Sequence, residues 1–593
     1  MAGRAQGAAA LHYRIEIGST HEHLLHASLR IDHPQAVTEL SLPVWIPGSY
    51  LVREFSRHLQ RLVARQGRNE LAVEQLDKAR WRVKADPSRP LELSWEVYAF
   101  DNSVRTAWLD ESRCFFNPTS LCLRVEGQHG GLHAIELPPP RLPRGTPRWE
   151  LATGLTPASV DSRGFGSYVA QDYDELADCP VEMGAFWSGR FKAGGVAHRF
   201  VVAGAPASFD GERLLRDTRR ICEAQIRFWH GSRRPPFKSY VFMLNAVNDG
   251  YGGLEHRNST ALICDRRDLP RRGDARISDG YTTLLGLVSH EYFHTWSVKR
   301  LRPAEFAPYR YDAENYSQLL WFFEGFTSYY DDLFLRRTGL IDDATYLRLL
   351  GKTANQVLQT PGRFVQSVAQ ASFDAWVKYY RQDENTPNAT VSYYTKGALV
   401  GLAFDLTLRA EGRGTLDDVM RGLWQRCKAG PMTEADFAAV LEEVGGRAFT
   451  REIAAWVHGT EELPLRQLLE KNGAQVHDDP AQMAQALGLR VTEGQAVQVK
   501  MVLSGGAGQQ AGLAAGDEWL GIELPARRGA EPQGWRIGRL DDIALYAGTA
   551  ARRITAIVAR DKRLLRLPVE LPQGTTTWRL SPRDAKALGG WLD

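Results

Sequence analysis

Apolar and polar residues alternate along much of the first 175 residues. This period of two predicts β-strands with one buried face, and prolines and glycines mark the turns between them. The clearest alternating segments are 11–19, 23–31, 91–99 and 121–127. We therefore expect an N-terminal β domain over residues 1–175, with the arrangement of a β-sandwich.

Beyond residue 175 the pattern becomes mixed. Strand patterns first flank an amphipathic helix, and helical spacing then dominates from residue 284 to about 459. We expect an α+β domain with a helical continuation over 176–465. Strand patterns and glycine turns return in 466–593, which predicts a third domain. The fold class is therefore multidomain α+β.

The helical segment 284–302 contains a His-Glu-x-x-His sequence, with His290, Glu291 and His294. Positions four apart lie on one face of a helix, so both imidazoles can reach the same metal ion. A glutamate beside that ion is typical of the general base of a zinc peptidase. We predict His290 and His294 as zinc ligands and Glu291 as the catalytic base.

A catalytic zinc ion takes three protein ligands and keeps one position open for water. The candidate for the third ligand is Glu324, 30 residues after His294 and the lone acid in the apolar segment 319–330. Gly325 is a poor helix former, and we interpret it as the small residue that lets the two helices approach closely. The sequence thus predicts one Zn²⁺ per chain, held by His290, His294 and Glu324.

Composition excludes several classes of protein. The 593 residues are 43% hydrophobic and 24% charged, as in an ordinary globular protein, and 73 basic residues nearly balance 70 acidic ones. This charge favours neither nucleic acid nor an anionic membrane. No apolar run reaches the length of a membrane span. The six scattered cysteines and the absence of a signal-peptide core predict reduced thiols and a cytoplasmic location.

These motifs resemble the glycyl aminopeptidase family of gluzincin zinc metallopeptidases. The resemblance extends from residue 43 to beyond 522, nearly the whole chain. It implies a β domain, a thermolysin-like catalytic domain and a C-terminal PDZ domain. The similar stretches are PVWIPGSYLVREF (43–55), YGGLEHRNST (251–260), SHEYFHTWSVKRLRP (289–303), LLWFFEGFTSYYDD (319–332), VSYYTKGALV (391–400) and AGLAAGDEWLGI (511–522).

The resemblance also implies how the substrate is bound. Wider relatives such as aminopeptidase N carry a Gly-x-Met-Glu-Asn motif, whose Glu holds the free α-amino group of the substrate. The segment 252–256, Gly-Gly-Leu-Glu-His, looks like its counterpart. Glu255 is thereby implied as the amine anchor, beside the substrate-binding backbone of Gly252 and Gly253. This sequence departs from the motif at His256, which stands in place of the Asn.

Two further features follow from the resemblance. The relatives place a tyrosine before Glu-Lys-Gly to stabilise the oxyanion, and Tyr394 precedes a similar Thr-Lys-Gly. Tyr394 is therefore the expected oxyanion donor, with Tyr393 as the alternative. In the PDZ-like region, 486–489 is the candidate loop for binding the carboxylate of a peptide C-terminus; the alternative is a PDZ-shaped packing module that binds no ligand.

Together these features predict a zinc-dependent aminopeptidase that removes an N-terminal residue from peptides with a free N-terminus. The family resemblance suggests glycine or alanine at the cleaved position. A zinc endopeptidase with the same metal site stays open, as does a non-catalytic, PDZ-containing peptide-binding protein. A zinc hydrolase acting on non-peptide substrates is a further alternative.

Overall fold

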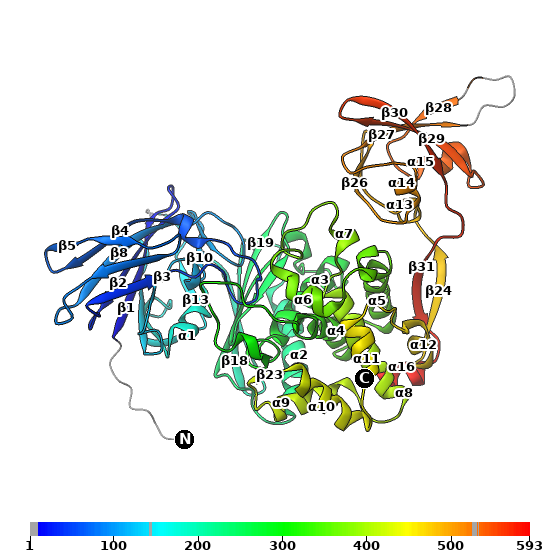
Figure 1. Cartoon of the computed structure of the whole chain (residues 1–593). Helices are drawn as coiled ribbons and strands as arrows, with labels where there is room; N and C mark the ends of the chain where they lie inside the picture. The colour runs from blue at the N-terminus through cyan, green and yellow to red at the C-terminus, as the bar shows by residue number, and fades with distance from the viewer. Residues whose placement is uncertain (1–9, 142–144, 525–530, 532) are drawn as a thin grey trace. The chain divides into compact units, whose positions relative to one another are not determined.

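A computed structural model describes residues 10–141, 145–524, 531 and 533–593 (Figure 1). The chain divides into two compact units. One comprises Met1–Asn315 with Trp424–Thr433, and the other comprises Tyr316–Leu423 with Glu434–Asp593.

The first unit begins with a β-rich domain. Its largest sheet has the strand order β14-β15-β12-β1-β2-β8-β4-β5. Along β1, buried Leu11, Tyr13 and Ile15 alternate with more exposed side chains, so the period-two pattern places one face of the sheet in the core. The strands are β1 (Leu11–Ser19), β2 (Leu24–Ile31), β4 (Leu59–Gln66), β5 (Asn69–Leu71), β8 (Leu91–Tyr98), β12 (His133–Leu137), β14 (Thr156–Val160) and β15 (Gly166–Ala170).

Two four-stranded sheets complete this domain, in the orders β13-β16-β10-β9 and β11-β3-β7-β6. The predicted β-rich N-terminal domain is thereby confirmed. The elements are β3 (Val37–Ser41), β6 (Val73–Gln75), β7 (Arg80–Lys84), β9 (Ala107–Leu109), β10 (Arg113–Phe116), β11 (Arg124–Val125), β13 (Glu150–Thr153), β16 (Val181–Gly184) and the short helix α1 (Tyr173–Ala177).

A five-stranded sheet, in the order β17-β18-β19-β21-β20, carries the second part of this unit. The central strands β18, β19 and β21 are parallel, and most residues of β19 are buried on both faces. β20 lies at one edge of the sheet, antiparallel to β21. The elements are β17 (Trp187–Ala193), β18 (Val196–Ala203), α2 (Gly211–His230), β19 (Ser239–Val247), β20 (Gly252–Glu255), β21 (Ser259–Asp265) and α3 (Asp279–Phe293), with a short pairing of β22 (Arg302–Pro303) and β23 (Pro431–Met432).

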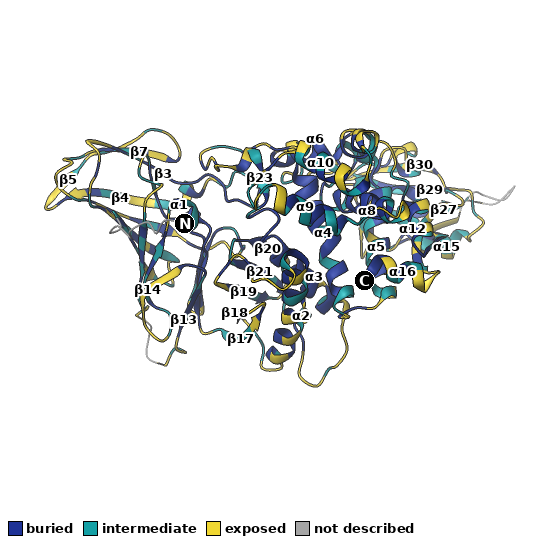
Figure 2. Cartoon of the chain, turned by 90° about the horizontal axis from the view of Figure 1, so that it is seen from below, coloured by how far each residue is buried: buried dark blue, intermediate teal, exposed yellow. Residues whose placement is uncertain are grey.

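The second unit begins with a helical part, in agreement with the predicted helical continuation of the α+β domain. Its central helix, α4, is mostly buried, and Figure 2 draws it largely in dark blue. The α-helices from residue 320 to residue 471 are α4 (Leu320–Arg337), α5 (Asp343–Leu358), α6 (Val368–Phe373), α7 (Thr386–Ala389), α8 (Thr395–Ala410), α9 (Leu416–Arg426), α10 (Glu434–Gly445), α11 (Thr450–Glu452) and α12 (Leu465–Lys471), and a π-helix follows α11 at Ile453–His458.

Gly325 lets two helices approach closely, but its neighbour is α8 and not α3. A Cβ at Gly325 would lie 2.5 Å from the Cα of Gly397, and one at Gly397 would lie 2.6 Å from the backbone oxygen of Trp321. Each glycine therefore fits against the backbone of the other helix. Because Gly325 follows Glu324 directly, this contact fixes the part of α4 that carries the predicted third ligand.

The C-terminal part contains a six-stranded sheet that β24 and β31 join to the helices. Its core is built from buried apolar residues that include Trp519, Ile522 and Val558. The elements are β24 (Ala474–Pro480), α13 (Met483–Leu487), β25 (Leu489–Glu493), β26 (Val497–Val502), α14 (Ala507–Gln510), β27 (Glu518–Leu524), β28 (Gln533–Arg536), α15 (Asp542–Ala547), β29 (Arg553–Arg560), β30 (Arg563–Glu570), β31 (Thr576–Pro582) and α16 (Ala585–Leu592).

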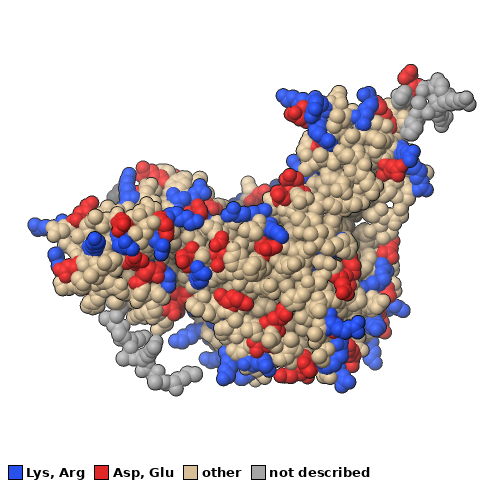
Figure 3. Space-filling view, in the orientation of Figure 1, with Lys and Arg blue, Asp and Glu red and all other residues tan. Residues whose placement is uncertain are grey.

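Basic and acidic side chains are intermixed on the face drawn in Figure 3. This agrees with the nearly balanced composition of the chain. Within the described residues, every helix is too short or too polar to cross a lipid bilayer.

Candidate active site

The His-Glu-x-x-His motif lies at the C-terminal end of α3. Ser278 caps the start of this helix, where its hydroxyl accepts a hydrogen bond from the Tyr281 N–H at 3.1 Å. His290 lies in the last turn, and His294 is the C-cap residue with helical backbone angles. The four-residue spacing therefore brings both imidazoles to one face, with their Nε2 atoms 3.0 Å apart.

A backbone carbonyl orients the ring of His294. The Nδ1 atom of His294 lies 2.6 Å from the Ser297 oxygen. Because a carbonyl oxygen can only accept, Nδ1 carries the proton and the lone pair of Nε2 stays available to a cation. Metal-binding histidines are commonly held in this way, through a hydrogen bond from their other ring nitrogen.

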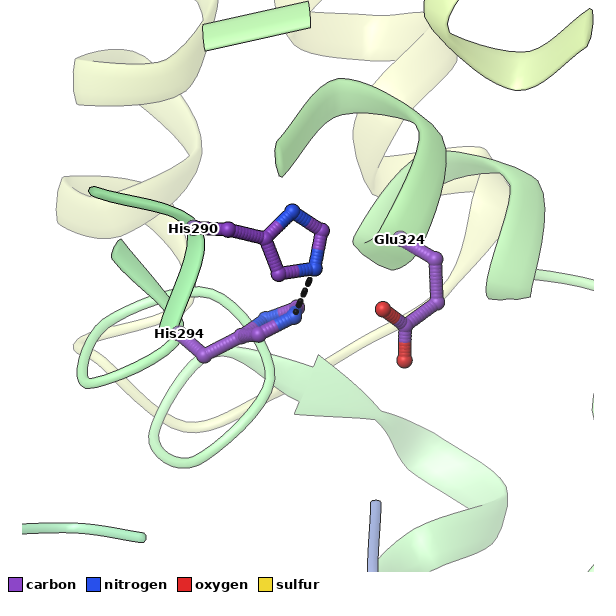
Figure 4. A group of neighbouring side chains, drawn as sticks. All are labelled: His290, His294 and Glu324. Carbon is purple, nitrogen blue, oxygen red and sulfur yellow. Dashed lines mark hydrogen bonds between the residues drawn. The ribbon is translucent and has the colours of Figure 1, made fainter. Parts of the chain in front are cut away.

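Glu324 lies in the first turns of α4, and its side chain is buried. Ligand atoms of His290, His294 and Glu324 all lie within 4.8 Å of one another. Figure 4 shows the Glu324 carboxylate on the same side as the two imidazole Nε2 atoms. Two imidazoles and a carboxylate are a ligand set of catalytic zinc, with bonds of about 2.0–2.2 Å that leave neighbouring ligand atoms roughly 3.3 Å apart. The donor chemistry and the spacing of these residues therefore fit a zinc ion.

Glu291 is buried and projects from α3 toward the edge strand β20. A Cβ added at Gly253 would overlap its Oε1 atom. The absence of a side chain at Gly253 permits close approach to its backbone, and Glu291 is the group that approaches. Any larger residue at Gly253 would displace the carboxylate of Glu291.

Glu255 ends β20, and its side chain is only 4% exposed. Its Oε1 atom is buried without a hydrogen-bond partner. The backbone of Gly48 packs against this carboxylate, because a Cβ there would lie 2.5 Å from both carboxylate oxygens. Gly48 also has φ of +97°, a conformation that favours glycine. Gly48 of the β domain therefore lies directly against the Glu255 carboxylate.

A buried charge cluster lies beside Glu255. Asp178 accepts from the Lys299 ammonium at 2.7 Å and from the Arg257 N–H at 3.0 Å, and His256 Nδ1 lies 3.2 Å away. Burial alone would raise the pKa of Asp178, but Lys299 and His256 hold it well below its usual range. Burial lowers the pKa of Lys299, but its neighbours together raise that pKa by more; Asp178 contributes most of this increase and Glu255 contributes a smaller part. A charged Lys299 therefore sits near a buried Glu255.

Sequence reasoning missed Asp178 and Lys299. Lys299 lies in the stretch 289–303, but Asp178 lies outside every quoted stretch and 121 residues away, so no sequence signal pairs the two. His256 was noted only as a departure from the relatives' motif. Its contact with Asp178 at 3.2 Å gives that departure a physical role.

Tyr394 lies at the N-cap position of α8 and is half-buried, whereas Tyr393 is fully buried. The hydroxyl of Tyr394 lies 3.4 Å from that of Tyr380. Burial and the negative charge of Glu324 raise the pKa of Tyr394 well above its ordinary value. The phenol therefore stays protonated and can donate a hydrogen bond, and of the two tyrosines Tyr394 is the more accessible.

Lys396 is a buried cation two residues after Tyr394. Its side chain is 3% exposed, and its ammonium donates a long hydrogen bond of 3.4 Å to the Arg363 carbonyl. Burial lowers the pKa of Lys396 from 10.5 to about 8. Between about pH 8 and pH 10.5 the unfolded chain binds more protons than the folded chain. The destabilisation caused by burying Lys396 therefore decreases as pH rises.

Lys396→Met is expected to raise the free energy of unfolding at pH 7 by about 1–3 kcal/mol, because methionine removes the buried charge at similar volume. The gain should shrink toward pH 10. Urea unfolding at pH 7 and pH 10 measures both values. The exposed Lys352 on α5 provides a control, since Lys352→Met should change stability by less than about 0.5 kcal/mol. A gain of equal size at both pH values would contradict a buried charge at Lys396.

Comparisons with known proteins found two family models and several solved structures that are similar to this chain. Residues 283–400 match the family model for the M61 glycyl aminopeptidase, and residues 12–185 match that for the peptidase M61 N-terminal domain. A solved aminopeptidase N family protein from Idiomarina loihiensis is 35% identical, with a TM-score of 0.90 over 98% of this chain and 100% of that chain. An M1 zinc metallopeptidase from Deinococcus radiodurans is 13% identical, with a TM-score of 0.48 over 77% of this chain and 94% of that chain. A comparison with curated proteins found no match.

Proposed function

Because the chain belongs to the M61 glycyl aminopeptidase family and is a zinc metallopeptidase of the aminopeptidase type, we propose that it removes a single N-terminal glycine or alanine from peptides. The observation that carries this proposal is the position of Glu255. Its buried carboxylate has an oxygen without a hydrogen-bond partner, two strand positions from the glycine that packs against Glu291. A substrate ammonium would supply that partner as a charge-assisted hydrogen bond.

The proposed metal ligands are His290, His294 and Glu324, holding one Zn²⁺ per chain. Their donor chemistry and their spacing within 4.8 Å support this assignment. When bound, the zinc ion supplies Lewis-acid chemistry, which polarises the scissile carbonyl and makes water more acidic.

Glu291 is the proposed general base. Its carboxylate accepts the proton of the attacking water and then delivers that proton to the leaving amine. The close packing of Gly253 against the Glu291 carboxylate limits the positions that this group can take.

Tyr394 is the proposed donor to the oxyanion that forms as water attacks. A donor in place before the reaction stabilises the charge where it develops. The raised pKa of Tyr394 supports this role, because a phenolate could not donate.

Glu255 is the proposed group that limits cleavage to one residue. Gly253 and Glu255 are two positions apart on β20, so their side-chain directions share one face of the strand. Glu291 lies over that face at Gly253. A peptide whose ammonium binds Glu255 therefore presents its first peptide bond near Glu291, with backbone contacts to Gly252 and Gly253.

We also propose the domain division 1–175, 176–465 and 466–593, with a thermolysin-like catalytic domain and a C-terminal PDZ domain. The six-stranded C-terminal sheet with its short helices supports the PDZ assignment. Its candidate ligand is a peptide C-terminus at the loop 486–489. The six cysteines are all unpaired, which supports the proposed cytoplasmic location.

The amine anchor gives a direct test. The wild-type enzyme should hydrolyse a glycyl reporter substrate at least about 100-fold faster than its N-acetyl form, because acetylation removes the cation that Glu255 binds. Glu255→Gln should lower kcat/KM on the free amine by about 10- to 100-fold, the size of a charge-assisted hydrogen bond. Steady-state kinetics on both substrates measures these effects.

Glu212→Gln is the matched control, because Glu212 is an exposed glutamate on α2. It should leave kcat/KM within about twofold of wild type. Equal hydrolysis of free and acetylated substrates would exclude Glu255 as the amine anchor. Cleavage inside an internally quenched peptide blocked at both ends would instead favour the endopeptidase alternative.

A further inference from the structure

Arg105 of the β domain reaches the edge strand of the predicted active site. It is half-buried, and its Nη2 donates a long hydrogen bond of 3.4 Å to the Gly253 carbonyl. Its Nε is buried without a hydrogen-bond partner. None of the described carboxylates forms an ion pair with Arg105. A guanidinium has five N–H donors in a planar fork, so most of its binding capacity is unused here.

Hydrogen bonds from Asn117 and to Ser103 hold the loop that carries Arg105. Asn117 is fully buried, and its Nδ2 donates to the carbonyls of Val104 at 2.9 Å and Thr106 at 3.3 Å. The N–H of Arg105 itself donates to the Ser103 hydroxyl at 3.2 Å. The backbone on both sides of Arg105 is therefore held by hydrogen bonds, which fixes the point from which its side chain extends.

The backbone of Gly253 lies on β20, the edge strand of the sheet, and its carbonyl accepts the long hydrogen bond from Arg105. The His256 N–H donates to the Ser259 carbonyl at 3.0 Å, which makes these two residues a hydrogen-bonded pair of the antiparallel ladder. Hydrogen-bonded and non-hydrogen-bonded pairs alternate along such a ladder. In the observed register, Leu254 and Gly252 therefore bond to β21, while Glu255 and Gly253 direct their N–H and C=O groups outward.

The edge strand β20 sets the direction and the length of a bound peptide. In the proposed function, the substrate ammonium lies at Glu255 and the first peptide bond lies near Glu291, over Gly253. The substrate must then run antiparallel to β20, toward Gly252, at about 3.3 Å per residue. The carboxylate of a dipeptide would lie one step beyond the scissile bond, opposite Gly252. Arg105 Nη1 lies 3.8 Å from the position of a Cβ at Gly252.

We propose that Arg105 binds the C-terminal carboxylate of a dipeptide substrate and so makes dipeptides the preferred substrates of this site. The inference rests on the proposed function, because the positions of the ammonium and of the scissile bond define where the carboxylate lies. A guanidinium binds a carboxylate through two parallel hydrogen bonds. A longer peptide would place a neutral amide at this point and would lose the charged contact.

The test compares glycyl-alanine with glycyl-alanine amide, which differ only in the charge at the C-terminus. The wild-type enzyme should favour the acid by about tenfold or more in kcat/KM, mainly through KM. Arg105→Ala should bring this ratio close to 1, and Arg105→Lys should give an intermediate ratio because a point charge replaces the fork. Arg65→Ala, at an exposed arginine of the same domain that pairs with Glu70, should keep the wild-type ratio.

Binding provides a second readout that does not depend on turnover. Calorimetry with Glu291→Gln protein should show glycyl-alanine binding about tenfold more tightly than its amide, and adding Arg105→Ala should abolish the difference. A wild-type ratio near 1, or a ratio unchanged by Arg105→Ala, would overturn the proposal. If no peptide is hydrolysed at all, the proposed function fails, but the binding comparison still decides the role of Arg105. If Arg105→Ala does not fold, the wild-type ratio and Arg105→Lys decide it.

Discussion

Replacing Glu291 with glutamine is expected to lower kcat by about 10²–10⁴-fold while the protein keeps its zinc. Glutamine preserves the size of the side chain but cannot accept a proton at neutral pH. Glu291 is not among the clustered ligand atoms of His290, His294 and Glu324, so metal binding should persist. Metal analysis of the purified variant, together with kcat on a glycyl reporter substrate, measures both quantities.

His290→Ala is the informative comparison for this variant. Removing one imidazole should lower both the zinc content and kcat, whereas Glu291→Gln should lower kcat alone. This contrast separates a ligand from a base, although the two residues are adjacent in the chain. A Glu291→Gln enzyme with a near-normal kcat would exclude Glu291 as the general base.

The chemistry of α3 could be predicted because it is local. The four-residue spacing of His290 and His294 places both side chains on the same face of a helix, and Ser278 caps the start of that helix. Glu324 could be named as a candidate because a carboxylate in a buried apolar segment is unfavourable unless it is paired or binds a metal ion. In each case, neighbouring residues in the sequence carry enough information to state a testable role.

The surroundings of Glu255 could not be predicted, because they come from distant segments. Gly48 lies more than 200 residues before Glu255, and Asp178 lies more than 100 residues before Lys299. No periodicity or motif pairs such positions. The same limit applies to Arg105, whose neighbour across the chain is Gly253. These contacts depend on how the β domain and the five-stranded sheet pack within one unit.

The wrongly predicted neighbour of Gly325 shows the same limit on a smaller scale. A glycine inside a buried helix predicts a close approach by another element, and the structure has one. The identity of that element depends on the packing of α4 against α8, which the local pattern does not contain. Sequence reasoning therefore found the need for a small residue but not its partner.

Tyr394→Phe is expected to lower kcat by about 10²–10³-fold, the usual effect of removing one donor to an oxyanion. Phenylalanine keeps the ring and removes only the O–H group. Because burial and Glu324 raise the pKa of Tyr394 well above its ordinary value, the wild-type phenol stays protonated across the neutral range. The loss should therefore be nearly constant between pH 6 and pH 9, and kcat measured over that range tests it.

Tyr393→Phe separates the two adjacent tyrosines. Tyr393 is fully buried, so a substrate would have to displace other side chains to reach its hydroxyl, whereas Tyr394 is partly exposed at the start of α8. We therefore expect Tyr393→Phe to change kcat by much less than Tyr394→Phe, with its main effect on thermal stability. If Tyr393→Phe reduced kcat more than Tyr394→Phe did, the oxyanion donor would be Tyr393, and the exposure of the two side chains would be a poor guide to their roles.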